Sequence, residues 1–228
     1  MRYIILLLIS IISAPFAHAQ INELGVYLGG SNFIGDVGAT TYIAPNQFTI
    51  GGIYKWNRTS RHSYRASLLF TTLKGEDSES EDPRRIQRDF EFTNRITEMS
   101  LGMEFNFIDF NLHSGRKVVS PYLYSGITLT KYNGIFINNG QQEQEEASNF
   151  TFGIPMTLGI KASFLDGIVI ALEAGARYTF TDRIDGNLSS NEANNFLQFG
   201  NTNNNDWYMF TGITLTYTFG TNPCYCVN

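Results

Sequence analysis

One stretch near the C-terminal end, residues 206–220 (DWYMFTGITLTYTFG), constrains the fold more than any other. Every second residue from Trp207 to Phe219 is apolar or aromatic except Thr211. The positions between them are smaller and more polar, and from Gly212 to Thr218 they are all Gly or Thr. Successive side chains of a β-strand point to opposite faces, so this period of two predicts a strand. The run exceeds the ~5–6 residues of a soluble strand and suits a tilted strand that crosses a bilayer. Such a closing strand must pair with the first strand, because an open sheet edge cannot survive in hydrocarbon.

The first residues predict export. Arg2 supplies a positive start, an apolar stretch follows, and Ala17-His18-Ala19 is a small-x-small cleavage sequence. This pattern is typical of a signal peptide and is too short for a membrane-spanning helix. We therefore predict a signal peptide at residues 1–19, a barrel at 20–220 and a periplasmic tail at 221–228.

Composition narrows the class of protein further. Only 16% of the residues are charged and 14% are aromatic, against a charged fraction of ~25% in typical soluble domains. The net charge of -5 argues against a nucleic-acid partner. Both cysteines lie in the last few residues, so no disulfide can staple a core.

Seven further runs with a period of two precede the last strand. They cover residues 23–30, 47–56, 64–71, 90–107, 121–132, 150–161 and 168–180. The connections alternate between long (31–46, 75–89, 138–148, 182–205) and short (57–62, 109–118, 165–167). Outer-membrane barrels have even strand numbers, short periplasmic turns and long outer loops. The prediction is an all-β, eight-stranded antiparallel transmembrane β-barrel of the outer membrane, with both termini periplasmic. Pro155 should introduce a bulge or a bend, because it removes a ladder donor.

The phase of the strands assigns charged residues to the interior of the barrel. Four acids and four bases share this face with Gly, Ser, Thr and Tyr: Glu23, Lys55, Arg65, Glu98, Glu104, Lys161, Glu173 and Arg177. Side chains just fill an eight-stranded barrel, and buried charges must pair or incur a desolvation penalty. We interpret this lumen charge network as a structural plug; a proton path or small pore is the alternative.

No catalytic, cofactor or metal constellation emerges from the sequence. The mature chain has only His62 and His113, both in short turns, so a serine nucleophile lacks its base. Glycine pairs lie in strands and precede no helix, which excludes a phosphate-binding loop. Cys224 and Cys226 supply only two metal ligands, although they could be oxidised or bridge to a partner. We predict a protein that is not an enzyme and binds no cofactor.

Several stretches together resemble a known family. These are ELGVYLGGSNFIGD (23–36), PYLYSGI (121–127), IPMTLGIK (154–161), EAGARYTFTD (173–182) and DWYMFTGITLTYTF (206–219). They resemble PorG, the small outer-membrane barrel of the type IX secretion system of Bacteroidetes, and the similarity covers essentially the whole mature chain. The resemblance implies a non-enzymatic role: the barrel docks the periplasmic ring of a PorK-type lipoprotein and its PorN-type partner (GldK and GldN types in gliding relatives).

The short-turn end then supplies a candidate partner surface. Its basic residues could face an acidic ring partner, although ordinary solvation of turns explains them equally well. The surface comprises Arg58, Arg61, Arg116, Lys117, Cys224 and Cys226. The alternative to a secretion role is a generic OmpA/OmpX-like barrel for envelope integrity or adhesion. A soluble lipocalin-type barrel fits less well because its interior would be apolar.

Overall fold

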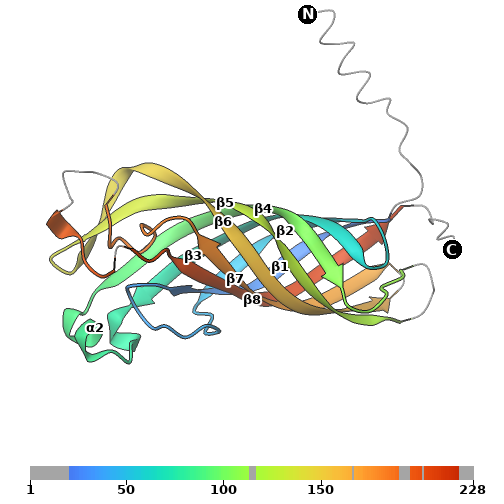
Figure 1. The fold of residues 1–228 in the computed structure, drawn as a ribbon, viewed down its shortest axis with the longest axis horizontal. Coiled ribbons are helices and arrows are strands. Elements are labelled where there is room, and N and C mark those ends of the chain that lie inside the picture. The colour runs from blue at the N-terminus through green and yellow to red at the C-terminus, as the bar shows by residue number, and fades with distance from the viewer. Residues whose placement is uncertain (1–20, 113–116, 166, 190–195, 202, 221–228) are drawn as a thin grey trace, which may run out of the picture.

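The computed structural model describes residues 21–112, 117–165, 167–189, 196–201 and 203–220. Eight antiparallel strands form a closed barrel in the order β1-β2-β3-β4-β5-β6-β7-β8 (Figure 1). The strands are β1 Ile21–Ile34, β2 Gln47–Asn57, β3 His62–Glu76, β4 Glu91–Asn106, β5 Val119–Asn138, β6 Gln141–Leu165, β7 Ile168–Thr179 and β8 Trp207–Phe219. The predicted strand number and fold are confirmed.

Closure depends on the pairing of the first and last strands. β1 pairs with β8 from Asn22 opposite Phe219 to Ile34 opposite Trp207. Every strand therefore has two neighbours, and the sheet has no open edge. The three short connections, the start of β1 and the end of β8 lie at one end of the barrel, which we call the short-turn end. The opposite end is the long-loop end.

The third long connection is not a loop. The prediction of a polar loop at residues 138–148 was wrong, because β5 and β6 continue as a hairpin with Asn138 opposite Gln141. The turn residues Asn139 and Gly140 have φ of 50° and 80°, a conformation that Asn-Gly adopts readily in two-residue hairpins. The hairpin extends beyond the barrel at the long-loop end (Figure 1).

Pro155 does not produce the predicted bulge. The pairs Ser125 opposite Met156 and Thr128 opposite Gly153 keep one register on both sides of it, and Pro155 lies opposite Arg177 of β7. The register shift in the β5–β6 ladder falls between Asn133 and Ile135. The strand therefore tolerates the missing donor without inserting a residue.

The connection between β3 and β4 contains two short helices, η1 (Asp77–Glu79) and α2 (Pro83–Arg88). The Asp82 side chain accepts a hydrogen bond from the Arg84 backbone N–H, and Pro83 occupies the first turn, where its missing N–H costs nothing. Within the described residues, no helix is long and apolar enough to cross a membrane.

The outer surface of the barrel wall carries a band of exposed apolar side chains. Aliphatic side chains form the middle of this surface, and aromatic side chains are exposed toward both ends, including Phe48 and Phe152 at the long-loop end and Phe107 and Tyr217 at the short-turn end. Rings at both ends of an apolar band are typical of membrane barrels.

The interior has two zones, whereas the sequence predicted a uniformly polar one. The zone toward the short-turn end contains most of the charged side chains. The zone toward the long-loop end is an apolar core in which Leu69 and Leu73 of β3 pack with Phe92 and Ile96 of β4. Ile184 of the β7–β8 connection is fully buried in the same cluster. The long-loop end is thus closed by a conventional hydrophobic core.

One long connection lies against the outer wall. Asn32, on the outward face of β1, donates through Nδ2 to the carbonyls of Thr41 (3.0 Å) and Tyr42 (3.1 Å) in the β1–β2 loop. A Cβ on Gly30 would meet the Cβ of Pro45 at 2.6 Å, so the loop also touches β1 there. Met209 of β8, opposite Asn32, is only 7% exposed although its phase places it outside.

Candidate functional site

All eight charged residues that were predicted to face the interior are buried in the lumen. The exposed fraction is at most 6% for each of them: Glu23, Lys55, Arg65, Glu98, Glu104, Lys161, Glu173 and Arg177. They come from β1, β2, β3, β4, β6 and β7. Alternate positions on these strands point inward, so the closed sheet concentrates the charges that its outer face lacks.

Two groups of ion pairs organise these charges. Arg65 donates to both carboxylate oxygens of Glu173, at 2.7 and 2.8 Å, and its Nη1 is 3.8 Å from Glu104. Glu104 also pairs with Lys161 at 2.6 Å and with Lys55 at 2.9 Å. A single carboxylate is therefore shared by two ammonium groups and one guanidinium.

The second group lies nearer the middle of the barrel. Arg177 Nε donates to Glu98 at 3.0 Å, and Tyr208 donates its hydroxyl to the same carboxylate at 2.6 Å. The Arg177 guanidinium lies 4.9 Å from the ring centre of Phe210. The eighth charge, Glu23, accepts hydrogen bonds from Asn57 Nδ2 (2.7 Å) and Thr216 Oγ1 (2.6 Å).

An aromatic side chain closes the short-turn mouth. Phe110, from the β4–β5 connection, is 5% exposed, and its ring centre is 4.6 Å from Lys161 Nζ. Its backbone N–H donates to the Ser60 carbonyl in the β2–β3 turn at 3.0 Å. The sequence assigned this connection to the surface, and the burial of Phe110 was not anticipated.

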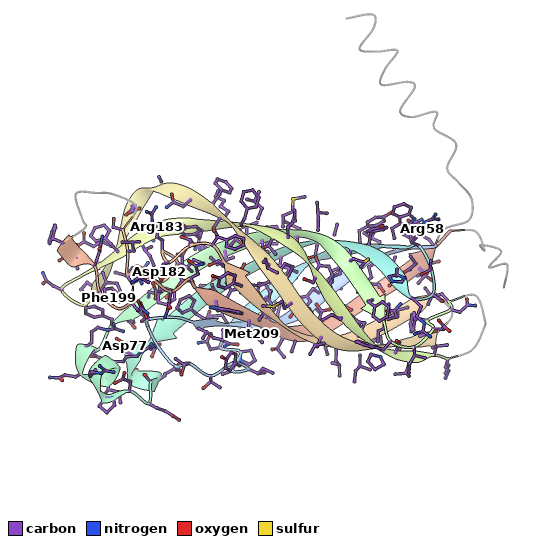
Figure 2. The ribbon with its side chains drawn as sticks, viewed as in Figure 1. Arg58, Asp77, Asp182, Arg183, Phe199 and Met209 are labelled. Carbon is purple, nitrogen blue, oxygen red and sulfur yellow. The ribbon has the colours of Figure 1, made fainter. Side chains whose placement is uncertain are left out.

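Three residues of the predicted partner surface, Arg58, Arg61 and Lys117, lie among the described residues. Arg58 and Lys117 are exposed at the short-turn end; Figure 2 shows Arg58 there. Arg61 is bound to neighbours, since it donates to Asp109 at 2.5 Å and to the Phe107 carbonyl at 2.9 Å. Its hydrogen bond lowers the pKa of Asp109. Arg116, Cys224 and Cys226, like the predicted signal peptide, lie outside the described residues.

Sequence reasoning missed an acidic cluster at the long-loop end. It consists of Asp36 from the β1–β2 loop and Asp182, Asp185 and Asp206 from the β7–β8 connection, joined by Asn187. Asn187 Nδ2 donates to Asp36 (3.0 Å) and to Asp182 (2.9 Å). The residues are far apart in the chain and lie in non-repetitive segments, so no period could have revealed the cluster.

A second ordered feature at this end is centred on Asp77, which is fully buried. Its carboxylate accepts two hydrogen bonds from Arg88, at 2.7 and 2.8 Å, and one each from the backbones of Gly38 and Phe90. The Arg88 guanidinium lies 4.7 Å from the ring centre of Phe199. Figure 2 shows Asp77, Asp182 and Phe199 at the same end of the barrel.

No group of three or more His, Cys, Asp or Glu in the described part of the chain has the geometry to hold a metal. The His62 ring packs against Phe105, with ring centres 5.2 Å apart and ring planes tilted by 58°. The other predicted histidine, His113, lies outside the described residues.

Three solved barrels are similar to this chain. Ail, the attachment invasion locus protein of Yersinia pestis, crystallised with the heparin analogue sucrose octasulfate, has 13% identity and a TM-score of 0.47, covering 88% of this chain and 99% of Ail. The N-terminal β-barrel domain of Pseudomonas aeruginosa OprF has 13% identity and a TM-score of 0.46, covering 89% and 98%. Neisserial surface protein A has 11% identity and a TM-score of 0.43, covering 88% and 95%. At this level of similarity nothing about binding carries over.

A comparison with curated proteins finds no match. The sequence pattern of one family matches residues 2–228, which is nearly the whole chain. The chain therefore belongs to the family described as Domain of unknown function (DUF6089).

Proposed function

We propose that this protein is a non-enzymatic barrel of the outer membrane that docks the periplasmic ring of a type IX secretion system. The observation that carries the proposal is the closed, apolar-surfaced barrel whose lumen is filled by ion pairs in one zone and by an apolar core in the other. Such a barrel is suited to hold a position in the membrane and unsuited to conduct a polypeptide. The partners are a PorK/GldK-type lipoprotein and its PorN/GldN-type partner, which the resemblance of residues 23–36 and 206–219 to PorG implies.

Outer-membrane location is supported by the distribution of apolar side chains. Leu158 and Leu172 are each about 60% exposed in the middle of the wall, where contact with water is unfavourable. Burial of this band in lipid removes the penalty, and the closed sheet presents no open strand edge to hydrocarbon. In this setting the short-turn end faces the periplasm, and both chain termini are periplasmic.

Docking on the periplasmic side is supported by two exposed basic side chains. Arg58 and Lys117 are exposed and lie in different connections, whereas Arg61 is already paired with Asp109. Charge complementarity accelerates association and fixes orientation more than it adds affinity. We therefore assign the ring contact to Arg58 and Lys117.

The test is a double reversal, Arg58→Glu with Lys117→Glu, in the native host. We expect less ring lipoprotein in crosslinked pull-downs and reduced secretion of cargo with a C-terminal signal. The matched control is Arg84→Glu at the opposite end, where the side chain is 91% exposed. Unchanged ring recovery with the double variant, at normal barrel levels, would reject this contact surface.

A second candidate is an envelope or adhesion role of the OmpA/OmpX kind. The structure of the long-loop end favours it. The β5–β6 hairpin projects there, and hydrogen bonds from Arg88 to Asp77 and from Asn187 to Asp182 hold the loops in place. Gene deletion separates the two roles. Lost cargo secretion supports ring docking, whereas a leaky envelope with intact secretion supports the second role.

A further inference from the structure

A polar cavity of about 420 Å³ opens at the long-loop end beside the acidic cluster. The chain supplies its wall from four separate segments. The carboxylates come from Asp36, Asp182 and Asp206, a guanidinium comes from Arg85 of α2, and an aromatic side comes from Tyr178 and Trp207. The volume matches that of sites for small organic ligands.

The carboxylates of this cavity lack a cationic partner in the described part of the chain. Arg85 is the one guanidinium in the described wall, and its Nη1 donates to the carbonyls of Gly35 and Gly38, both at 2.9 Å. None of the ion pairs formed by described residues joins Arg85 to Asp36, Asp182 or Asp206. The three carboxylates thus outnumber this guanidinium, which is bound to backbone.

Neutral donors hold the carboxylates in place. Asp36 Oδ2 accepts from the Asn201 backbone N–H at 2.7 Å and from Asn187 Nδ2 at 3.0 Å. Asp206 Oδ2 accepts from the Ile184 backbone N–H at 2.8 Å. These contacts orient the acids toward one another without cancelling their charge.

One buried polar atom beside these carboxylates has no hydrogen-bond partner among the described residues. Asn187 is fully buried, its amide end lies between Asp36 and Asp182, and its Oδ1 has no hydrogen-bond partner among the described residues. A buried acceptor without a donor is unfavourable, and native proteins rarely leave one. Asn187 is not part of the described wall of the cavity, but it joins Asp36 and Asp182, which are, so these two carboxylates are held beside a polar group that is itself unsatisfied.

The titration of the cluster agrees with a missing cation. Burial and the nearby Asp36 carboxylate raise the pKa of Asp182 to about 6. Burial, with Asp36 and Asp182 nearby, raises the pKa of Asp185 to about 7. Like charges in a desolvated site disfavour ionisation until a counter-charge arrives.

We propose that this cavity binds the ammonium or guanidinium group of an organic cation presented at the long-loop end. The cavity is larger than a single ion requires, and the described residues offer no preformed metal geometry. Tyr178 and Trp207 lie with ring centres 4.8 Å apart in the wall, and aromatic faces attract organic cations. This site is at the end opposite the proposed ring contact and does not depend on it.

Trp207 offers a direct readout, because the chain has one other tryptophan, Trp56, at the short-turn end. The experiment uses the full-length Trp56→Phe barrel, folded in detergent and titrated at pH 8 with n-butylguanidinium chloride. We expect a saturable change in Trp207 fluorescence. The neutral analogue n-butylurea tests for simple apolar partition, and calcium chloride tests for a metal.

Variants locate the site. Asp182→Asn and, separately, the more accessible Asp36→Asn should weaken n-butylguanidinium binding by about tenfold or more, the loss expected when one partner of a buried charge pair is removed. Asp109→Asn at the short-turn end should bind as the parent does. Heat-modifiable gel mobility confirms that each variant is folded. The proposal is overturned by the absence of saturation, by equal binding of n-butylurea, by a response to calcium alone, or by unchanged affinity in folded Asp36→Asn.

Discussion

Arg65 is the residue on which the charge network of the lumen most depends, because it forms a bidentate pair with Glu173 and approaches Glu104. Its Nε has no hydrogen-bond partner among the described residues, and its guanidinium lies 4.7 Å from the ring centre of Tyr124. Arg65→Leu leaves the Glu173 carboxylate buried with the Tyr122 hydroxyl as its remaining described donor. We expect a loss of about 3–5 kcal/mol in the free energy of unfolding, measured by urea titration in lipid bilayers.

The double variant Arg65→Leu with Glu173→Leu is the informative control. Removing both charges removes the desolvation penalty as well, so the double loss should be clearly smaller than the sum of the single losses. Asp109→Ala, which breaks an exposed pair with Arg61, should change stability little. Additive single losses would show that Arg65 and Glu173 do not act as a pair.

The acidic cluster predicts a pH dependence. The pKa values of Asp182 (about 6) and Asp185 (about 7) lie above the ordinary value of 3.8, so the folded state binds protons more tightly than the unfolded state. The stabilisation that these two carboxyl groups give the folded state is fully present below about pH 4 and is lost as the pH rises through 6 and 7. Without added ligand, Asp185→Asn should therefore gain thermal stability relative to the parent between pH 5 and pH 8. A difference in melting temperature that stays constant over this range would contradict the assignment.

At the level of single residues, the phase of each strand predicted which side chains point inward. It could not predict their partners, because Arg65 and Glu173 are 108 residues apart and meet only across the closed barrel. The cluster around Asn187 was beyond sequence reasoning for a related reason. Its members lie in loops, where no period constrains the direction of a side chain.

The β5–β6 hairpin depends on its two turn residues. A Cβ on Gly140 would meet nothing within 4 Å, so φ of 80° is the whole obstacle to substitution. Gly140→Ala should destabilise the projecting part of the hairpin by about 1 kcal/mol. Hydrogen exchange should accelerate at residues 135–144 and remain slow in the barrel wall.

Gly52 supplies the matched control. A Cβ added there would also meet open space, but the φ of Gly52 is not positive. Gly52→Ala should therefore leave hydrogen exchange of the hairpin unchanged. Equal exchange in both variants would show that the turn conformation does not limit the hairpin.

The extension of the β5–β6 hairpin was predicted wrongly because its sequence has no period of two. Residues 141–146 (QQEQEE) are polar on both faces, because the extended hairpin stands outside the barrel and has no buried side to impose a period. The Asn139-Gly140 pair was the available signal, since Asn-Gly favours a two-residue hairpin turn. Helix α2 had a signal too, in the Asp82-Pro83 start.

The whole molecule should not conduct ions. The paired charges of the lumen, Phe110 at one mouth and the apolar core at the other leave no continuous polar path through the side chains described. Planar bilayers containing the purified barrel should show no stepwise current. Steady ohmic channels from the parent protein would contradict a plugged lumen.

At this scale the sequence predicted most of the architecture. Hydrocarbon requires every strand to be paired and favours apolar side chains at outward positions, so a period of two is visible in all eight strands. Inward positions are less constrained, because either ion pairs or hydrophobic packing can fill a narrow barrel. Consequently the division of the interior into a charged zone and an apolar zone was not predicted.

The β1–β2 loop that Asn32 fixes to the outer wall has a mechanical consequence. The pairing of β1 with β8 closes the sheet, so separation of these two strands would open the barrel wall. The loop covers the β1–β8 pairing near Asn32 and Met209. The other end of the pairing, where Asn22 faces Phe219, lies among the short turns. We therefore expect any separation of β1 from β8 to begin at the end where Asn22 faces Phe219, which this loop does not cover.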